Sequence, residues 1–118
     1  MFLTLSGDIL VPTYGNGVVL VRPGSDGWAA VWRSGQESCK ASPLVTNEAF
    51  VEVSLDGLIA CFDVVSKSLP SLRWRSTVSV PIFAEPVLHK DFVIVMTVTG
   101  VLVTLEVKSG RTSQILGW

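Results

Sequence analysis

The pentapeptide Ala41-Ser42-Pro43-Leu44-Val45 returns 43 positions later as Ala84-Glu85-Pro86-Val87-Leu88. The same shift holds without a gap over the next two dozen positions, where glycine falls on glycine, serine on serine and apolar residues on apolar residues. The matched pairs are Phe50-Val51 with Val93-Ile94, Gly57 with Gly100, Leu58-Ile59 with Val101-Leu102, Phe62-Asp63 with Leu105-Glu106, Val64 with Val107 and Ser66 with Ser109. A repeat of this period is typical of chains built from stacked supersecondary units.

An earlier and shorter copy precedes these two. It is marked by an acidic residue before an apolar run, by an Asn-Gly or Asp-Gly pair and by a closing tryptophan. The matching segments, at a shift of 40 positions, are Asp8-Ile9-Leu10-Val11 with Glu48-Ala49-Phe50-Val51 and Asn16-Gly17 with Asp56-Gly57, and the closing tryptophans are Trp32, Trp74 and Trp118. We therefore predict about two and a half to three units, the first of which lacks its opening strand.

Each unit has the periodicity of strands, without the apolar spacing of a helix. The run 58–62 is apolar at consecutive positions, which requires a sheet covered on both faces. The predicted strands are 41–45, 49–54, 58–63 and 72–75 in the second unit and 84–88, 92–98, 101–107 and 113–116 in the third. The predicted fold class is all-β: a partial β-propeller of about two and a half to three four-stranded antiparallel blades. One incomplete propeller would span 1–118, with blade one at about 7–34, blade two at about 39–76 and blade three at about 80–118.

Glycine, proline and tryptophan each have an expected place in such a blade. Asn-Gly and Asp-Gly pairs allow the positive φ angles of tight hairpins. Pro43 and Pro86 cannot donate a ladder hydrogen bond, so we expect them at a free edge, which in a propeller is the innermost strand. The closing tryptophans are expected on the outer strands, packed at the seams between blades.

A recognisable signature recurs in the units. Ala-Ser-Pro opens the second unit, a hairpin turns at Asp-Gly, an apolar strand ends in an acidic residue, a turn contains Gly110 and a tryptophan closes the unit. This signature resembles the quinoprotein-type, or PQQ-like, β-propeller repeat, from about Asp8 to Trp118. It departs from that repeat where Glu85 replaces Ser42, where Glu106 replaces Asp63 and where Lys67 stands in place of the turn glycine.

The resemblance carries expectations about function. The PQQ-like repeat occurs in quinone-dependent dehydrogenases, in outer-membrane assembly scaffolds, in luminal stress sensors and in the C-terminal part of the beta-alanine-activating enzyme of the acyl-CoA synthetase family. The last looks most similar, because its units favour a cysteine near Cys61 and the enzyme is cytosolic. Its adenylate-forming and carrier regions have no counterpart in this sequence, so the resemblance assigns no catalytic residue to this chain.

The composition indicates a folded chain, and the positions of the cysteines favour a reducing compartment. Apolar residues make up 48% and charged residues 16%, and a net charge of −1 leaves no electrostatic footprint for nucleic acid or an anionic membrane. The longest apolar stretch, Phe92–Leu105, is too short to span a bilayer, and residues 1–8 are not expected to act as a secretory signal. Cys39 and Cys61 occupy non-equivalent repeat positions, so we expect free thiols and a cytoplasmic location.

No catalytic, cofactor-binding or metal site is predicted. The sequence has neither the adjacent cysteines nor the acidic calcium cluster of a PQQ dehydrogenase, and His89 with two separated cysteines matches no zinc spacing. A Gly-x-Ser-x-Gly elbow and a second histidine are also missing. His89-Lys90-Asp91 is therefore expected to be a polar turn. The repeat places Glu85 and Lys40 where they could line a central channel, although solvated strand ends are the favoured interpretation.

These observations predict an interaction or scaffolding module with no enzymatic activity and no cofactor of its own. Its partner would be a protein or the remaining blades of a parent propeller, and its uncovered ends would make the isolated chain self-associate. Two alternatives stay open. One is a C-terminal fragment of a multidomain acyl-activating, beta-alanine-activating enzyme, and the other is a small β ligand-binding module, which needs a closed pocket.

Overall fold

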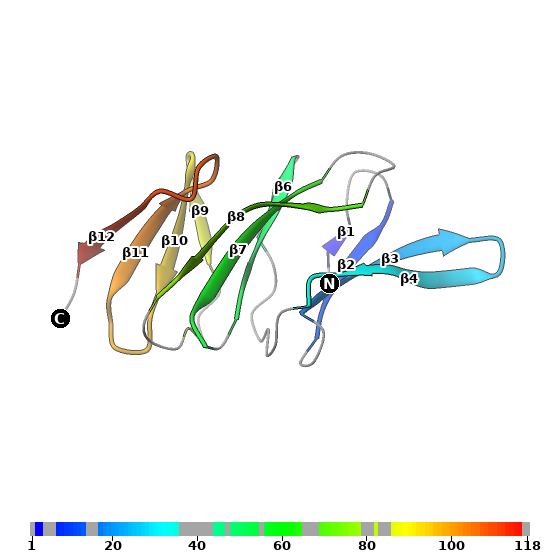
Figure 1. Cartoon of the computed structure of the whole chain (residues 1–118), viewed down its shortest axis with the longest axis horizontal. Coiled ribbons are helices and arrows are strands. Elements are labelled where there is room, and N and C mark those ends of the chain that lie inside the picture. The colour runs from blue at the N-terminus through cyan, green and yellow to red at the C-terminus, as the bar shows by residue number, and fades with distance from the viewer. Residues whose placement is uncertain are drawn as a thin grey trace.

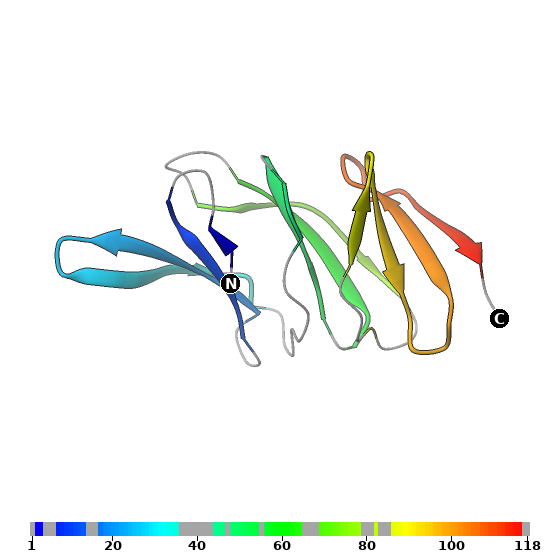
Figure 2. The same cartoon turned by 180° about the vertical axis from the view of Figure 1, so that it is seen from behind.

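The computed structural model shows strands joined by turns (Figures 1 and 2). The described residues are 2–3, 7–13, 17–35, 44–46, 48–54, 56–64, 69–78, 82 and 86–116, and the description of side chains omits 2–3, 12 and 113–116. These residues form three four-stranded antiparallel sheets and contain no helix, which confirms the all-β prediction. Within the same ranges no helix exists that could cross a membrane.

The first sheet has its strands in the order of the chain. They are β1 (Phe2–Leu3), β2 (Ile9–Pro12), β3 (Val18–Gly24) and β4 (Gly27–Arg33). The prediction that the first unit lacks its opening strand is wrong, because Phe2 pairs with Leu10 and Leu3 with Ile9. This blade therefore begins before the predicted boundary at residue 7. Two residues are too few to give a recognisable periodicity in the sequence.

The second and third sheets follow the repeat. The second contains β5 (Leu44–Val45), β6 (Ala49–Val53), β7 (Leu58–Asp63) and β8 (Ser71–Thr77), and the third contains β9 (Val87–His89), β10 (Phe92–Met96), β11 (Leu102–Glu106) and β12 (Thr112–Leu116). Only β7 has its predicted bounds, and β8 is longer at both ends. His89 ends a strand instead of lying in a turn, because it pairs with Phe92 across the two residues 90 and 91.

The proline prediction can be followed at one of its two positions. Pro86 directly precedes β9, which is an edge strand of the third sheet. Pro43 lies outside the described residues, as do 41–42 and 84–85, so its place at a free edge stays a prediction. The two turn glycines are equivalent as expected, since Gly57 and Gly100 have φ angles of 94° and 86°.

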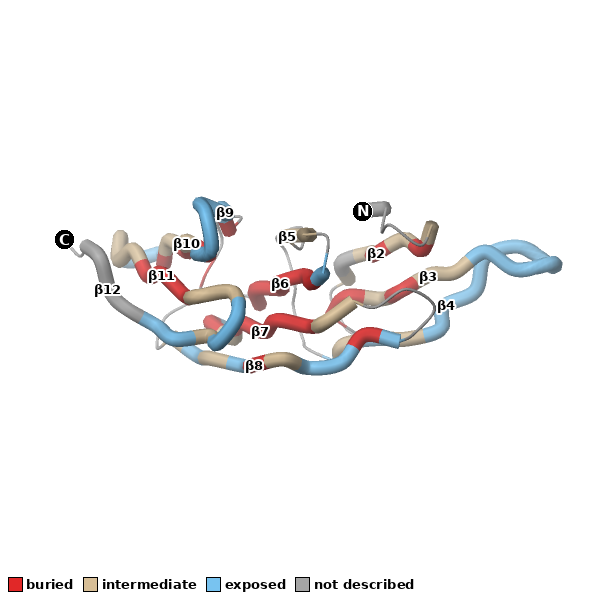
Figure 3. The backbone as a smooth tube through the Cα atoms, turned by 90° about the horizontal axis from the view of Figure 1, so that it is seen from above, coloured by how far each residue is buried: buried red, intermediate tan, exposed pale blue. Residues whose placement is uncertain are grey.

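The three sheets stack face to face, as consecutive propeller blades do (Figures 1 and 3). One apolar cluster lies between the first and second sheets and another between the second and third. The middle sheet is thus covered on both faces, and every residue of β6 is buried. This confirms the expectation drawn from the consecutive apolar residues of β7. Figure 3 also shows β5 and β9 along one side of the stack and β4, β8 and β12 along the other.

The ladders correct the alignment of the first unit on the second. Pro12 pairs with Val18 where Val53 pairs with Ile59, each closing a five-residue turn. Equivalent residues are therefore 41 positions apart and not the 40 predicted from the Asn-Gly and Asp-Gly pairs. Since side chains alternate along a strand, a slip of one residue exchanges the two faces. The side chains that the first sheet buries toward the second are Leu10, Val18 and Leu20.

A buried hydroxyl residue closes two of these hairpin turns. Ser54 Oγ accepts a hydrogen bond from the Leu58 amide at 3.1 Å, and Thr97 Oγ1 accepts one from the Val101 amide at 3.1 Å. In both turns the hydroxyl residue's own amide donates to the carbonyl of the same partner, at 2.9 and 3.0 Å. The glycines of these turns were recognisable in the sequence, whereas the contribution of the hydroxyls depends on the fold.

The distal part of the β3–β4 hairpin projects beyond the stack, on the side away from the second sheet (Figures 1 and 3). We term Arg22–Val31 the arm. Gly24 pairs with Gly27 across a two-residue turn, and all residues from 23 to 31 are exposed. The base of the arm is anchored by Arg22, whose Nη2 donates to buried Asp8 at 3.0 Å. This hydrogen bond raises the pKa of Arg22.

Candidate functional site

The seam between the second and third sheets is fixed by a tryptophan. Trp74 lies on the outer strand β8, and its Nε1 donates to the carbonyl of Val107 in the β11–β12 turn at 2.6 Å. Gly110 of the same turn packs against the indole so closely that a Cβ there would lie 2.6 Å from Trp74 Cδ2. The prediction of a seam tryptophan on an outer strand is confirmed at this position. The contact also explains why this turn needs a glycine.

Polar groups of the second sheet converge on the same carbonyl. Arg73 forms an ion pair with Asp63, and its Nη1 donates to the Val107 carbonyl at 3.4 Å. The buried Cys61 thiol approaches that oxygen at 3.9 Å. Burial raises the pKa of Cys61 to about 11, with Arg73 opposing and Asp63 reinforcing the shift. The thiol is unpaired and stays protonated at neutral pH, so it is structural rather than nucleophilic.

A buried carboxylate holds the seam between the first and second sheets. Glu52 is 1% exposed, and its Oε2 accepts hydrogen bonds from Ser34 Oγ at 2.9 Å and from the Val18 amide at 3.2 Å. Sequence reasoning missed this residue. Its signal was present, because Glu52 is the one charged residue in the apolar run of β6. Its counterpart in the third sheet, at the 43-residue shift, is Val95, so the repeat itself does not require it.

The other predicted seam tryptophans differ from Trp74. Trp32 on β4 makes edge-to-face contacts with Phe50 and Phe62, at centroid distances of 5.9 and 5.1 Å. It therefore lies at the first seam, as predicted. Trp118 lies outside the described residues. The position that pairs with Thr104, the counterpart of Cys61, is Ser113, so the third sheet has no tryptophan at the place of Trp74.

One hollow of about 330 Å³ opens between the second and third sheets. Its lining mixes three basic, two acidic and three uncharged residues: Arg73, Lys90, Lys108, Glu48, Asp91, Thr46, Leu88 and Val107. Lys90 takes a positive φ of 55° at its rim. The described residues gather no group of three acidic, histidine or cysteine side chains that could hold a metal ion. The hollow is open and of mixed charge.

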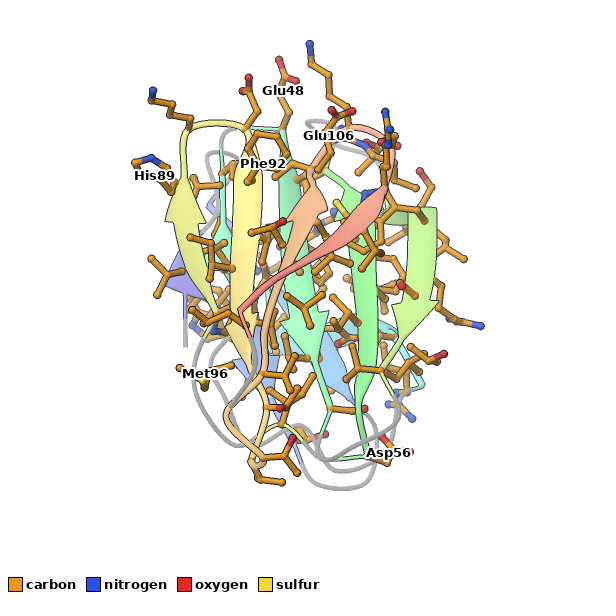
Figure 4. All side chains as sticks on the ribbon, turned by 90° about the vertical axis from the view of Figure 1, so that its left-hand side faces the viewer. Glu48, Asp56, His89, Phe92, Met96 and Glu106 are labelled. Carbon is orange, nitrogen blue, oxygen red and sulfur yellow. The ribbon has the colours of Figure 1, made fainter. Side chains whose placement is uncertain are left out.

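Of the residues considered from the sequence as possible site members, His89 and Cys61 lie in the described part of the chain. His89 is exposed at the end of β9, and its side chain points away from the sheet (Figure 4). Cys39, Lys40 and Glu85 lie outside the described residues, so their placement near a channel stays a prediction. The structure offers surfaces, rather than a constellation of side chains, as the candidate functional site.

The outer face of the third sheet is one such surface (Figure 4). It carries Phe92, Ile94, Met96 and Leu102, which are half-buried or exposed. At the 43-residue shift their counterparts in the second sheet are Ala49, Val51, Val53 and Ile59, which are buried against the third sheet. The third sheet therefore presents to solvent the same face that the second sheet covers with a neighbour.

The outer face of the first sheet is the opposite surface. Its central strands carry four β-branched, half-buried side chains, which pair across the sheet as Ile9 with Val21 and Val11 with Val19. Their counterparts in the second sheet at the 41-residue shift are the buried residues Phe50, Glu52, Ala60 and Phe62. Both ends of the stack thus leave open a face that is covered in the middle sheet.

Comparisons with known proteins agree with this architecture. No protein-family model matches the chain, and no curated protein matches it in sequence. Among solved structures, the crystal structure of BamB from Moraxella catarrhalis matches 93% of this chain with a TM-score of 0.63 and 18% sequence identity. BamB is a β-propeller protein. The chain has a β-propeller-type fold.

The extent of that match is informative. This chain spans 35% of the length of the BamB chain, so its three sheets correspond to part of a propeller. At 18% identity the similarity establishes the fold alone. The expected link to the acyl-CoA synthetase family finds no support in these comparisons.

Proposed function

We propose that this chain is a non-catalytic segment of a PQQ-like propeller that acts as a protein-interaction module through the two outer faces of its stack. The proposal rests on one observation. A face that is open at the end of the stack is equivalent, in the repeat, to a face that is buried in the middle sheet. Ile94 and Met96 are half-buried at the end of the stack, whereas their counterparts Val51 and Val53 are buried at a seam. In stacked repeats such a face is completed by another sheet of the same kind.

The two outer faces differ in the size of their side chains. The first sheet offers short β-branched side chains, and the third offers longer ones such as Phe92 and Met96. The middle sheet packs the equivalent of each of these two faces against a neighbouring sheet, so the remaining blades of a parent propeller, or a protein that supplies their equivalent, complete both ends. In isolation, the third sheet of one copy can pack on the first sheet of the next in an open-ended series.

The rest of the proposal follows the chemistry of the described residues. A reducing, cytoplasmic compartment is supported by Cys61, a buried and unpaired thiol. The open hollow between the second and third sheets is not the closed pocket that a ligand-binding module needs. We assign no catalytic role, and no observation favours the acyl-activating alternative.

Charged substitutions on each outer face test the proposal. Ile94→Arg on the third sheet and Val11→Arg on the first place a guanidinium in a face that must become dry on association. Val98→Arg is the matched control, because Val98 is an apolar residue that is 48% exposed in a hairpin turn. Sedimentation velocity at increasing concentration is the measurement. We expect the wild type and the control to form species larger than dimers, and each face variant to lose them.

Two results would contradict the proposal. One is a wild-type chain without any species larger than a dimer. The other is a series of large species that persists in both face variants, since the association would then use another surface. Circular dichroism of each variant confirms that the sheets are retained.

A further inference from the structure

The arm differs from the equivalent part of the third sheet. In the third sheet, β11 and β12 are joined by the turn that receives Trp74 at Val107 and Gly110. In the first sheet, β3 and β4 instead continue pairing to Gly24 and Gly27. The first sheet therefore has no turn that could receive a tryptophan from a preceding blade. The arm occupies that place.

The outer edge of the arm is an unpaired strand edge without charged residues. β4 is the last strand in its sheet, and within the described part of the chain no strand pairs with its outer side. Its sequence Gly-Trp-Ala-Ala-Val-Trp carries no charge before Arg33. The equivalent edge strand β8 carries two arginines, Arg73 and Arg75. Charged residues on edge strands prevent pairing with another chain, and β4 lacks them where it leaves the stack.

The geometry of the hairpin defines which backbone groups are available. Gly24 and Gly27 close a two-residue turn, so they form a hydrogen-bonded pair. Because hydrogen-bonding directions alternate along an antiparallel strand, the amides that point outward are those of Trp28 and Ala30. A bulge at Val31 ends this regular segment, since Leu20 pairs with Trp32 and the next pair is Val21 with Ala30.

This edge is complementary to itself. When two copies of β4 run antiparallel about an axis at Ala29, Trp28 of one copy lies opposite Ala30 of the other. Ala29 then meets Ala29 at a non-hydrogen-bonded pair, where strands approach most closely and a small side chain fits. The regular segment from Gly27 to Ala30 carries no charge, so this register brings no like charges opposite each other. The arms project away from the second and third sheets, which keeps the bodies of the two copies apart (Figure 1).

We propose that the arm is a dimerisation element, in which β4 pairs antiparallel with β4 of a second copy of this chain about a two-fold axis at Ala29. This contact is separate from the outer faces of the proposed function and forms a closed dimer, whereas the faces form an open-ended series. A single strand pair is smaller than a standard interface, so the dimer is weak and depends on concentration.

Charge pairs across the axis test the proposal. All proteins carry Ile94→Arg, so that association through the outer faces does not contribute. In this background we expect dimers of the 12.7 kDa chain by sedimentation equilibrium at concentrations up to about 100 μM. Ala29→Lys and Ala29→Glu each place two like charges opposite each other, and each is expected to weaken the dimer by about tenfold or more. An equimolar mixture of the two is expected to restore a heterodimer.

Ala29 is exposed, so neither substitution disturbs a core, and circular dichroism verifies the fold. The matched control is Val98→Lys, at a turn far from the arm, which should leave the dimer unchanged. The proposal is overturned if the Ile94→Arg chain stays monomeric throughout, if the lysine and glutamate variants dimerise like the parent, or if their mixture stays monomeric. If the Ile94→Arg chain stays monomeric, the strand that pairs with β4 would belong to a different protein.

Discussion

Trp74 of the second sheet and Gly110 of the third are in such close contact that no side chain fits between them: an added Cβ would lie 2.6, 2.7 and 2.9 Å from three atoms of the indole. The same indole donates its N–H to the Val107 carbonyl three residues before the glycine. One side chain thus fixes both the distance between two blades and their orientation. This contact explains why the tryptophan of the second unit occurs together with the turn glycine of the third.

Gly110→Ala should destabilise the fold by about 2–4 kcal/mol, because it combines overpacking against Trp74 with a strained positive φ. Gly35→Ala is the matched control, since Gly35 has φ of 79° and nothing within 4 Å of an added Cβ. Its cost should be about 1 kcal/mol, from the backbone alone. Urea unfolding measures both. Equal costs would show that the Trp74 contact adds nothing to stability.

Glu52 and Ser34 should be energetically coupled across the first seam. Glu52→Ala removes a buried acceptor and leaves a cavity, at a cost of about 2–4 kcal/mol. Ser34→Ala should cost less in the Glu52→Ala background than in the wild type, with a coupling energy of about 1 kcal/mol. A double-mutant cycle by chemical denaturation provides the value. Additive effects would mean that the two sheets are not joined by this hydrogen bond.

Cys61 should make the fold less stable at alkaline pH. Its pKa is raised from 9.0 to about 11, mainly by burial, so the unfolded chain loses the thiol proton first. The stability associated with the protonated thiol is complete below pH 9 and is lost as the pH rises from 9 toward 11. The slope of the unfolding free energy over this range, measured in a Cys39→Ser background, should be shallower in Cys61→Ala. An unchanged slope would contradict the assignment.

Lys90→Gly should stabilise the chain by about 1 kcal/mol, because Lys90 has a positive φ of 55° that glycine adopts without strain. Lys90→Ala keeps the strain and serves as the control, with an expected change within about 0.5 kcal/mol. Thermal unfolding followed by circular dichroism compares them. If both variants gain the same stability, loss of the charge beside the hollow is responsible and the backbone argument is wrong.

The repeat predicted the architecture well, because residues that allow blades to stack recur at a fixed period. The strand content, the two covered faces of the middle sheet and the seam position of Trp74 follow from it. The predicted alignment of the first unit was wrong by one residue. It matched Gly17 to Gly57, whereas the strand pairing makes Pro12 the equivalent of Val53. Register depends on pairing between strands, which a single glycine does not define.

The surfaces were harder to predict than the core. The opening strand β1 has two residues and no periodicity, and the arm follows from how far β3 and β4 continue to pair. Glu52 interrupts an apolar run, yet its partners Ser34 and Val18 are distant in sequence and become neighbours only when the sheets stack. Hydrogen bonds between particular residues of two blades are not encoded in the periodicity of either blade.

Hydrogen exchange at two concentrations tests most directly the claim that the stack has one fully covered sheet and two open ends. At about 1 μM the amides of β6 and β7 should exchange most slowly, and those of β2, β3, β10 and β11 should be less protected. At about 100 μM the outer sheets should gain protection while the middle sheet changes little. Protection that is equal in all three sheets and independent of concentration would contradict the account, because both outer faces would then already be covered within one chain.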